Sequence, residues 1–256
     1  MVDPAFKPAT LITGASAGLG AEFARQCAAR GERVVLVARR GERLKDLAAE
    51  IGGAEIIVAD LSEPGAGTSV VGEAITRDLW IRKLINNAGF GLIGQFERLS
   101  IAKQLEMIDL NIRALTNLTF VVLNDMRLRG EGAILNVAST AAFQPGPKMA
   151  VYFATKAFVL SFTEAVHEEL KPHGINVSCL CPGPTRTEFG KVAGFGGNAA
   201  FDRVAMEAPE VVAAGLQGLE KNHAVVVPGI VNKIVAASTR FAPRPIVRKI
   251  AGSIKY

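Results

Sequence analysis

The sequence predicts an α/β protein built on one doubly wound parallel sheet, in a single domain with helices on both faces. Short, β-branched runs alternate with longer helical patterns along the whole of the 256 residues, as expected for successive βαβ units. The short runs are continuously apolar, which indicates strands that helices cover on both sides. With 49% hydrophobic residues, the chain can build the large core of one domain of this length.

The order of these patterns defines the expected elements. Strands are predicted at residues 10–13, 33–37, 55–58, 83–86, 133–137, 176–180 and 224–227. Helices are predicted between them, at residues 18–30, 41–51, 66–78, 100–129, 149–171, 209–221 and 230–240. No repeat or linker divides the chain, so residues 1–256 are expected to form one domain.

One long irregular stretch interrupts this alternation at residues 182–208. It is rich in glycine and carries Phe189, Phe195 and Phe201. Long loops in compact domains are often lids or binding loops. We therefore expect a substrate loop at 182–208, and a basic helix or tail at 230–256.

The first predicted strand runs directly into a glycine-rich turn that opens a helix. Gly14, Gly18 and Gly20 allow a tight turn and the close approach of a pyrophosphate, which the amides and positive dipole end of the helix would bind. The spacing Gly-x-x-x-Gly-x-Gly differs from the usual Gly-x-Gly-x-x-Gly. An ordinary glycine-rich turn is the alternative, but the position at the first strand–helix junction favours a dinucleotide site.

The end of the second predicted strand indicates which dinucleotide binds. Ala38 stands where a fold selective for NAD usually has an acid for the ribose 2′-hydroxyl, and Arg39 and Arg40 follow it. Guanidinium groups match the geometry of phosphate, so NADP(H) is predicted ahead of NAD(H). Two solvated arginines are the alternative, although the start of a helix usually favours acids.

A tyrosine–lysine pair indicates chemistry. Tyr152 is one of only two tyrosines, and Lys156 follows it four residues later, so both side chains share one face of a helix. A nearby ammonium favours the phenolate and lowers the tyrosine's pKa from about 10. Tyr152 could then exchange a proton with an oxygen at working pH. A half-buried tyrosine beside a solvated lysine is the alternative.

These motifs together resemble the classical short-chain dehydrogenase/reductase family, with its Rossmann-like fold, over almost the whole chain. Asp60 and Leu61 are similar to the pair beside the adenine ring, and residues 86–89 (Asn-Asn-Ala-Gly) match the motif after the fourth strand. The resemblance implies a cofactor site made of Gly14, Ser16, Gly18, Leu19, Gly20, Arg39, Arg40, Asp60, Leu61, Asn87, Ala88, Gly89, Tyr152, Lys156, Pro182, Gly183, Thr185 and Thr187.

The resemblance also implies a catalytic set of four residues. Tyr152 would be the general acid in reduction and the base in oxidation, while Lys156 would hold the nicotinamide ribose and lower the tyrosine's pKa. Ser139 would donate a hydrogen bond to the carbonyl oxygen. Asn111 would support a water that links Lys156 to solvent; an asparagine that kinks its helix is the alternative. Many NADPH-selective members have a basic residue where Ala17 stands, so the preference for NADP(H) rests on the two arginines.

The expected activity is the NADP(H)-dependent interconversion of a carbonyl and a secondary alcohol by hydride transfer. Segments 90–93, 141–149 and 186–208 should wall the substrate pocket with apolar side chains, which favours a hydrophobic substrate; outside the loop phenylalanines these are Phe90, Ile93, Phe143, Pro145 and Met149. Ketones, acyl-chain ketoesters and steroids remain open as substrates. The alternatives are a non-catalytic NADP(H)-binding regulatory protein, or a 3-ketoacyl-type or steroid reductase loosely associated with membranes.

The net charge of +5 is concentrated in the tail. Residues 224–256 contain no acid but six basic residues, which leaves 23 basic and 24 acidic residues elsewhere. The body therefore lacks the basic surface of a nucleic-acid binder. The apolar, basic tail is expected to make weak contact with a membrane surface, to cap the fold or to contact another subunit. The resemblance suggests a homodimer or homotetramer built by the helices at 100–129 and 149–171.

The cysteines argue for a reducing compartment and against a metal site. There are three, Cys27, Cys179 and Cys181, and no cluster of histidines or carboxylates accompanies the Cys-x-Cys pair. Sparse, odd cysteines are typical of reduced thiols, so a cytoplasmic location is expected.

Overall fold

The structure is a computed structural model that describes residues 6–188 and 205–253. Within them, the seven predicted strands form one parallel sheet in the order β3-β2-β1-β4-β5-β6-β7. The strands are β1 Lys7–Thr13, β2 Val34–Ala38, β3 Glu55–Val58, β4 Leu79–Asn86, β5 Gly132–Val137, β6 Ile175–Leu180 and β7 Val225–Val226. The strand prediction is confirmed, although β1 and β4 begin earlier than expected and β7 is shorter.

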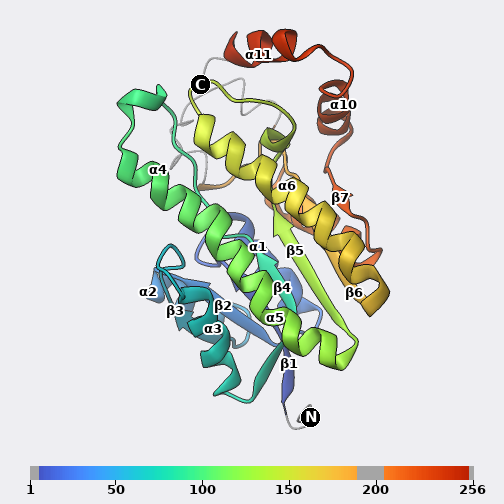
Figure 1. Ribbon diagram of the computed structural model, residues 1–256. Helices are drawn as coiled ribbons and strands as arrows, with labels where there is room; N and C mark the ends of the chain where they lie inside the picture. The colour runs from blue at the N-terminus through green and yellow to red at the C-terminus, as the bar shows by residue number, and fades with distance from the viewer. Residues whose placement is uncertain (1–5, 189–204, 254–256) are drawn as a thin grey trace.

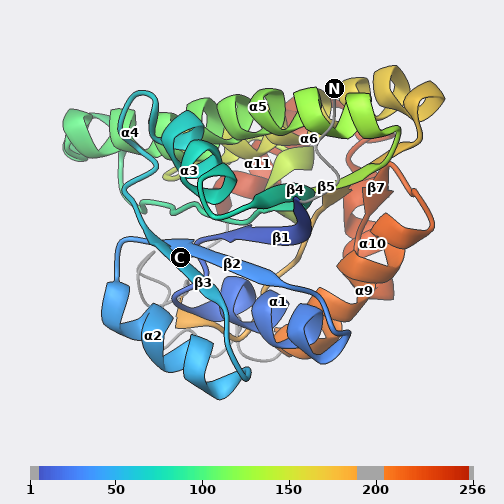
Figure 2. The same ribbon diagram turned by 90° about the horizontal axis from the view of Figure 1, so that it is seen from below.

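Helices cover both faces of this sheet. Figure 2 shows α3, α5 and α6 on one side and α1, α2 and α9 on the other. Their bounds are α1 Gly18–Ala29, α2 Gly41–Glu50, α3 Ala66–Ile75, α5 Leu115–Arg129, α6 Ala150–Leu170 and α9 Ala208–Glu220. The doubly wound, Rossmann-like single domain predicted from the sequence is therefore confirmed.

Two apolar cores, one on each face, explain why the strands are continuously apolar. Leu11 and Val35 belong to the core under α3 and α5, whereas Ile12 and Leu36 belong to the core under α1 and α2. All four side chains are fully buried. Because successive side chains of a strand point to opposite faces, a strand between two helix layers must be apolar at every position.

The helix predicted at 100–129 is wrong in one respect. The structure has α4 at Ile101–Ile108 and α5 at Leu115–Arg129, separated by a π-helical segment at Asp109–Ala114. Such π-helical turns are rare in proteins, and those that occur are often found at functional sites. Here the segment contains Asn111, so the wider turn lies where the sequence predicted a catalytic asparagine.

The C-terminal region is more ordered than a single helix with a tail. It contains α10 Ile230–Ser238 and a second helix, α11 Arg244–Ser253, at the top of the molecule in Figure 1. Pro245 lies in the first turn of α11, where a missing backbone N–H costs no intrahelical bond. No helix in the described part of the chain is long and apolar enough to cross a membrane.

The strand order places a crevice beside β1. This strand pairs with β2 on one side and β4 on the other, so the connections after β1 and β4 leave in opposite directions. Ligands of open α/β sheets bind at such a switch point, outside the carboxyl ends of the strands.

Candidate active site

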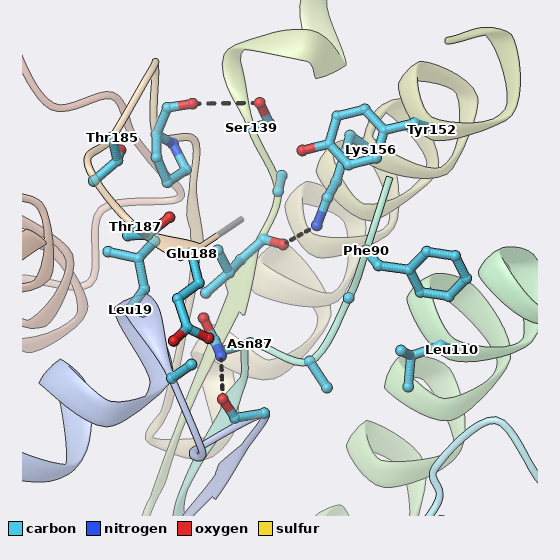
Figure 3. A pocket seen from close by; sticks show the side chains of 18 of the residues that line it. Leu19, Asn87, Phe90, Leu110, Ser139, Tyr152, Lys156, Thr185, Thr187 and Glu188 are labelled. Carbon is cyan, nitrogen blue, oxygen red and sulfur yellow. Dashed lines mark hydrogen bonds between the residues drawn. The ribbon is translucent and has the colours of Figure 1, made fainter. Parts of the chain in front are cut away.

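A cavity of about 720 Å³ opens at the carboxyl ends of the strands. All of the predicted cofactor-binding residues except Gly20 line it, as do Ser139, Tyr152 and Lys156 of the predicted catalytic set. Figure 3 shows how these side chains, which come from loops far apart in the sequence, face one space. Asn111 does not line the cavity.

The glycine-rich turn forms a cradle of backbone at the start of α1. Gly14 adopts φ +66° and Gly18 φ +55°, a left-handed conformation that favours glycine. A Cβ at Gly20 would lie 2.2 Å from the carbonyl oxygen of Gly14, so this glycine lets the helix approach the turn. The first turn of α1 contains no acid, and its N-cap, Ala17, makes no side-chain cap. The helix end therefore fits an anionic group such as a pyrophosphate.

A threonine joins this turn to the loop after β4. The hydroxyl oxygen of Thr13 accepts hydrogen bonds from the backbone amides of Asn87 and Ala88, at 3.0 and 2.9 Å. In return, the side-chain amide of Asn87 donates to the carbonyl oxygen of Thr13 at 2.9 Å. The two loops at the switch point are thus held as one unit, and residues 87–89 face the cavity beside the glycine turn.

The two predicted arginines lie at one end of the cavity but make different contacts. Arg39 lies 3.3 Å from Asp60 and 3.4 Å from Glu106. Arg40 donates from Nε and Nη2 to the Ser16 hydroxyl, at 3.1 and 3.0 Å. Arg40 is therefore tied to the glycine turn, where the ribose next to the adenine would lie if the turn binds the pyrophosphate.

At the other end of the cavity, three polar side chains converge. Tyr152 and Lys156 project from α6, and the Lys156 Nζ lies 5.8 Å from the centroid of the tyrosine ring. The Ser139 side chain, at the end of β5, forms a hydrogen bond with the Tyr152 side chain. Ser139 Oγ also accepts a hydrogen bond from the amide of Ala141, at 3.1 Å. Figure 3 shows the Tyr152 hydroxyl directed toward Ser139.

The titration of this group differs from the sequence prediction. Burial raises the pKa of Tyr152 to about 12, although the Ser139 hydrogen bond acts to lower it. Burial likewise lowers the pKa of Lys156 to about 8. The expected lowering of the tyrosine's pKa by the lysine is therefore not present, because removing both groups from water disfavours both charged forms.

Asn111 is held by three hydrogen bonds rather than directed into the cavity. Its Oδ1 accepts from the amide of Phe90 at 3.2 Å, and its Nδ2 donates to the Phe90 carbonyl and the Thr155 hydroxyl, both at 3.1 Å. Only Gly89 separates it from the lysine: a Cβ there would lie 2.9 Å from Asn111 Oδ1 and 3.6 Å from Lys156 Nζ. The asparagine therefore positions the loop after β4 against α6.

Sequence reasoning missed three residues near the site. The Thr155 hydroxyl accepts a hydrogen bond from the side-chain amide of Asn111 and donates one to the carbonyl oxygen of Tyr152 at 2.7 Å. Arg43 and Glu188 form an ion pair at 2.9 Å next to Arg40. Thr155 lies inside the Tyr-x-x-x-Lys motif, but nothing in the sequence brings Arg43 and Glu188 together, because 145 positions separate them.

Apart from Gln144 and the candidate catalytic side chains, the part of the cavity next to Tyr152 is apolar. It is lined by Phe90, Leu110, Ala141, Gln144, Met149 and Phe153. Of the predicted lining, Phe90 and Met149 are present, whereas Ile93, Phe143 and Pro145 do not line the cavity. Phe189, Phe195 and Phe201 lie outside the described residues. Among the described lining residues, Lys156 is the one charged group at this end.

The cysteines show no metal-binding arrangement. Cys179 and Cys181 are buried, with their sulfur atoms 3.7 Å apart, and Cys27 is buried elsewhere. Within residues 6–188 and 205–253 there is no group of three or more histidine, cysteine, aspartate or glutamate side chains that could hold a metal ion.

Comparison with known proteins relates this chain to a family of dehydrogenases and reductases. The family model described as short chain dehydrogenase matches residues 8–194. Sulfoacetaldehyde reductase 2 of Chromohalobacter salexigens is 38% identical over 197 residues, which cover 75% of this chain and 78% of the relative.

Two solved structures are similar over nearly the whole chain. A short-chain dehydrogenase from Sphingobium yanoikuyae in complex with NADPH is 36% identical, with a TM-score of 0.81 and 97% of both chains covered. A bulky-bulky ketone specific alcohol dehydrogenase from Comamonas testosteroni is 30% identical, with a TM-score of 0.77, covering 97% of this chain and 95% of that one.

Proposed function

The chain belongs to the short chain dehydrogenase family, and we propose that it is an NADP(H)-dependent reductase that acts on a hydrophobic carbonyl compound. The resemblance seen in the sequence is thereby confirmed. As a family member the protein is an oxidoreductase acting on CH–OH or carbonyl groups, and it binds a nicotinamide cofactor. Its cofactor preference, substrate and catalytic residues are the subject of the proposal.

The observation that carries the proposal is the convergence of Ser139, Tyr152 and Lys156 at the apolar end of the cavity. A carbonyl group placed there would have its oxygen within reach of the two hydroxyl groups. When bound, the cofactor supplies the hydride. Ser139 then donates a hydrogen bond to the oxygen as negative charge develops on it, and Tyr152 donates its phenolic proton to the same oxygen.

The high pKa of Tyr152 suits the reductive direction. With a pKa of about 12, the phenol keeps its proton at neutral pH, so it is in the form that a general acid needs. An alkoxide is a stronger base than a phenolate, so the transfer is downhill. Lys156 would hold the ribose of the cofactor with its Nζ and provide positive charge close to the tyrosine as the phenolate forms.

The preference for NADP(H) is supported by charge. Arg39 and Arg40 line the cavity beside Ser16, and Ala38 leaves no acid at the end of β2 to receive a ribose 2′-hydroxyl. The structural relative from Sphingobium yanoikuyae was solved with NADPH.

The hydrophobic substrate is supported by the lining next to Tyr152. Sulfoacetaldehyde is small and anionic and would need a cation to receive its sulfonate, yet Lys156 is the one cation among the described lining residues at that end. A bulky ketone, like that named for the relative from Comamonas testosteroni, matches this surface better. Ketones, acyl-chain ketoesters and steroids all have the required carbonyl and apolar body.

The experiment is a panel of carbonyl compounds followed by the loss of NADPH absorbance. We expect aryl and steroid ketones to be reduced faster than sulfoacetaldehyde, and NADPH to bind more tightly than NADH. Tyr152→Phe should lower turnover by a factor of about 10² to 10⁴ and change NADPH affinity less than about twofold, as removal of a hydroxyl that acts in the chemical step would do. Tyr256→Phe, at the only other tyrosine, is the matched control.

Two results would contradict the proposal. Faster reduction of sulfoacetaldehyde would reject the hydrophobic substrate. NADPH binding without turnover on any member of the panel would favour the alternative, a non-catalytic regulatory protein on the same fold.

We also propose that the protein is a homo-oligomer in the cytoplasm. Helices α5 and α6 cover the same face of the sheet (Figure 2), and their outer surfaces expose Phe120, Leu128 and Phe158. Exposed large apolar side chains on adjacent helices favour burial against a second subunit. The buried, unpaired thiols of the three cysteines are compatible with a reducing compartment.

A weak contact with anionic membranes is proposed for the C-terminal helices. Phe241, between α10 and α11, is 87% exposed, and Ile230, Ile234 and Ile250 are also exposed. The basic residues of the same region attract anionic headgroups while the apolar side chains enter the interface. Flotation with phosphatidylserine vesicles at low salt tests this: wild type should co-float and Phe241→Ser less so. A protein that does not float but changes mass with Phe241→Ser would instead show a subunit contact.

A further inference from the structure

A carboxylate lies on the arginines at the cofactor end of the cavity. Glu188, directly after Thr187 in the loop that follows β6, lies 2.9 Å from Nη1 of Arg43 through each of its two oxygens. One of these oxygens also lies 3.4 Å from Nη1 of Arg40. Glu188 lines the cavity together with Arg40 (Figure 3 shows Glu188 among the lining side chains).

The two arginines lie where we expect the ribose next to the adenine of the cofactor to bind. Arg40 is bound through Nε and Nη2 to the hydroxyl of Ser16, within the glycine-rich turn. Arg43 is the third residue of α2, the helix that follows β2, and Glu188 joins its guanidinium to that of Arg40. Under the proposed function, this is where the 2′-phosphate of NADP(H) binds.

The Glu188 carboxylate and a 2′-phosphate cannot both bind the two arginines favourably. The Arg43 guanidinium lowers the pKa of Glu188 below its usual value, so the carboxylate is ionised at neutral pH. A 2′-phosphate within hydrogen-bonding distance of the same guanidinium groups would lie a few ångströms from Glu188, and like charges at such distances repel. A phosphate also offers more acceptor oxygens and more negative charge than a carboxylate, so it can take both arginines.

We propose that Glu188 is a specificity-determining residue that competes with the 2′-phosphate of NADP(H) for Arg40 and Arg43, an inference that rests on the proposed preference for NADP(H). NADPH must displace the carboxylate to bind, whereas NADH, which lacks the phosphate, leaves the ion pair in place. Arg43 is thereby assigned to the phosphate site together with Arg40. Glu188 holds the two guanidinium groups together and lowers the affinity for NADPH in doing so.

The consequence is a selective gain of affinity when the carboxylate is removed. Glu188→Gln keeps the size and hydrogen-bonding capacity of the side chain but removes its charge. The dissociation constant of NADPH should fall by about threefold, because half-exposed ion pairs of this kind are individually weak. The dissociation constant of NADH should change by less than about 1.5-fold. Arg43→Gln should have the opposite effect, weakening NADPH and leaving NADH unchanged.

The experiment measures both dissociation constants by calorimetry at low ionic strength for wild type and the variants. Glu207→Gln is the matched control, since Glu207 forms a similarly exposed ion pair with Arg186, 2.6 Å apart, and does not line the cavity. It should change neither constant. We expect the same comparison to hold for adenosine 2′,5′-bisphosphate against 5′-AMP. These two ligands differ by the 2′-phosphate and lack the nicotinamide half of the cofactor.

The outcomes separate this inference from the function on which it rests. If wild type binds NADH as tightly as NADPH, the proposed cofactor preference fails, whatever the variants do. If wild type prefers NADPH but Glu188→Gln changes both cofactors equally, changes neither, or weakens NADPH, the competition fails while the proposed function stands. A selective gain with Glu188→Gln and a selective loss with Arg43→Gln would establish it.

Discussion

Lys156 donates a hydrogen bond from its Nζ to the backbone carbonyl oxygen of Val137, at 2.8 Å. This bond holds a side chain that is only 6% exposed at the end of β5, two residues before Ser139. One carbonyl dipole replaces little of the hydration that an ammonium loses on burial, so the pKa of Lys156 falls to about 8. Keeping the buried Lys156 side chain protonated therefore lowers the stability of the folded protein.

Stability should reveal this cost through its dependence on pH. The pKa of Lys156 is 10.5 in the unfolded chain and about 8 in the folded one, so between these values the unfolded chain binds more protons. Raising the pH through this window stabilises the folded state, by up to about 3 kcal/mol for the full shift. Lys156→Met lacks this gain. Urea unfolding should show the variant to be more stable than wild type at pH 7, with the difference shrinking toward pH 10.

An exposed lysine provides the control for that measurement. Lys45 lies at the surface of α2 with its side chain 65% exposed, so Lys45→Met should differ from wild type by a similar amount at both pH values. A Lys156→Met variant whose stability relative to wild type is the same at pH 7 and pH 10 would show that Lys156 titrates normally.

Asn111 should act as a positioning residue whose loss destabilises the fold. It is 2% exposed and satisfies both backbone groups of Phe90 as well as the Thr155 hydroxyl. Asn111→Ala removes the partners of the part-buried amide and carbonyl of Phe90 and leaves the Thr155 hydroxyl only its bond to Tyr152, which should lower the free energy of unfolding by about 2 to 4 kcal/mol. Asn111→Asp keeps an acceptor for the Phe90 amide but loses the donor. Urea unfolding of both variants measures the effect, and a loss below 0.5 kcal/mol would contradict it.

The same variants separate positioning from catalysis. Because Asn111 holds the loop after β4 beside Lys156, Asn111→Ala should weaken NADPH binding as well as slow turnover. A variant that binds NADPH normally but turns over slowly would instead assign Asn111 to the proton transfer itself.

Gly20→Ala should damage the cofactor cradle while the fold persists. The added Cβ would lie 2.2 Å from the backbone oxygen of Gly14, and a backbone atom cannot rotate away as a side chain can. The glycine turn must shift, so we expect NADPH affinity to fall by more than about tenfold, equivalent to about 1.4 kcal/mol. Gly72→Ala in α3 is the matched control: nothing lies within 4 Å of its Cβ, and alanine should stabilise this helix. Unchanged NADPH binding in Gly20→Ala would show that the turn is more tolerant than its geometry implies.

The sequence was most informative where local chemistry determines structure. The strands were predictable because helices on both faces make each position apolar, as Leu11 and Ile12 show by facing different cores. Gly14 and Gly18 marked the turn because their backbone angles favour glycine. These features depend on residues close together in the chain.

Features that depend on tertiary contacts were not predictable. The helical sequence pattern continues through Asn111 and gives no sign of the π-helical segment found there. This segment accompanies hydrogen bonds from Asn111 to Phe90 and Thr155, which are distant in the sequence. The pairing of Arg43 with Glu188 joins residues 145 positions apart, so it depends on how the whole chain folds. The predicted direction of the Tyr152 pKa shift was wrong. A Tyr-x-x-x-Lys spacing indicates a nearby positive charge, but it does not indicate the burial that raises the pKa.

The apolar surface of α5 and α6 gives the last prediction. Phe120 is 70% exposed on α5, and Phe158 on α6 stacks on Phe162 with ring centroids 5.7 Å apart. If this surface is buried between subunits, a glutamate at Phe120 places a charge in an apolar contact, which is costly without a partner. Phe120→Glu should therefore reduce the mass measured by light scattering toward that of a monomer, 27.0 kDa. Phe96→Glu, at a similarly exposed phenylalanine outside these helices, should keep the wild-type mass. Wild-type mass in Phe120→Glu would place any subunit contact elsewhere, and a monomeric wild type would remove the proposed oligomer altogether.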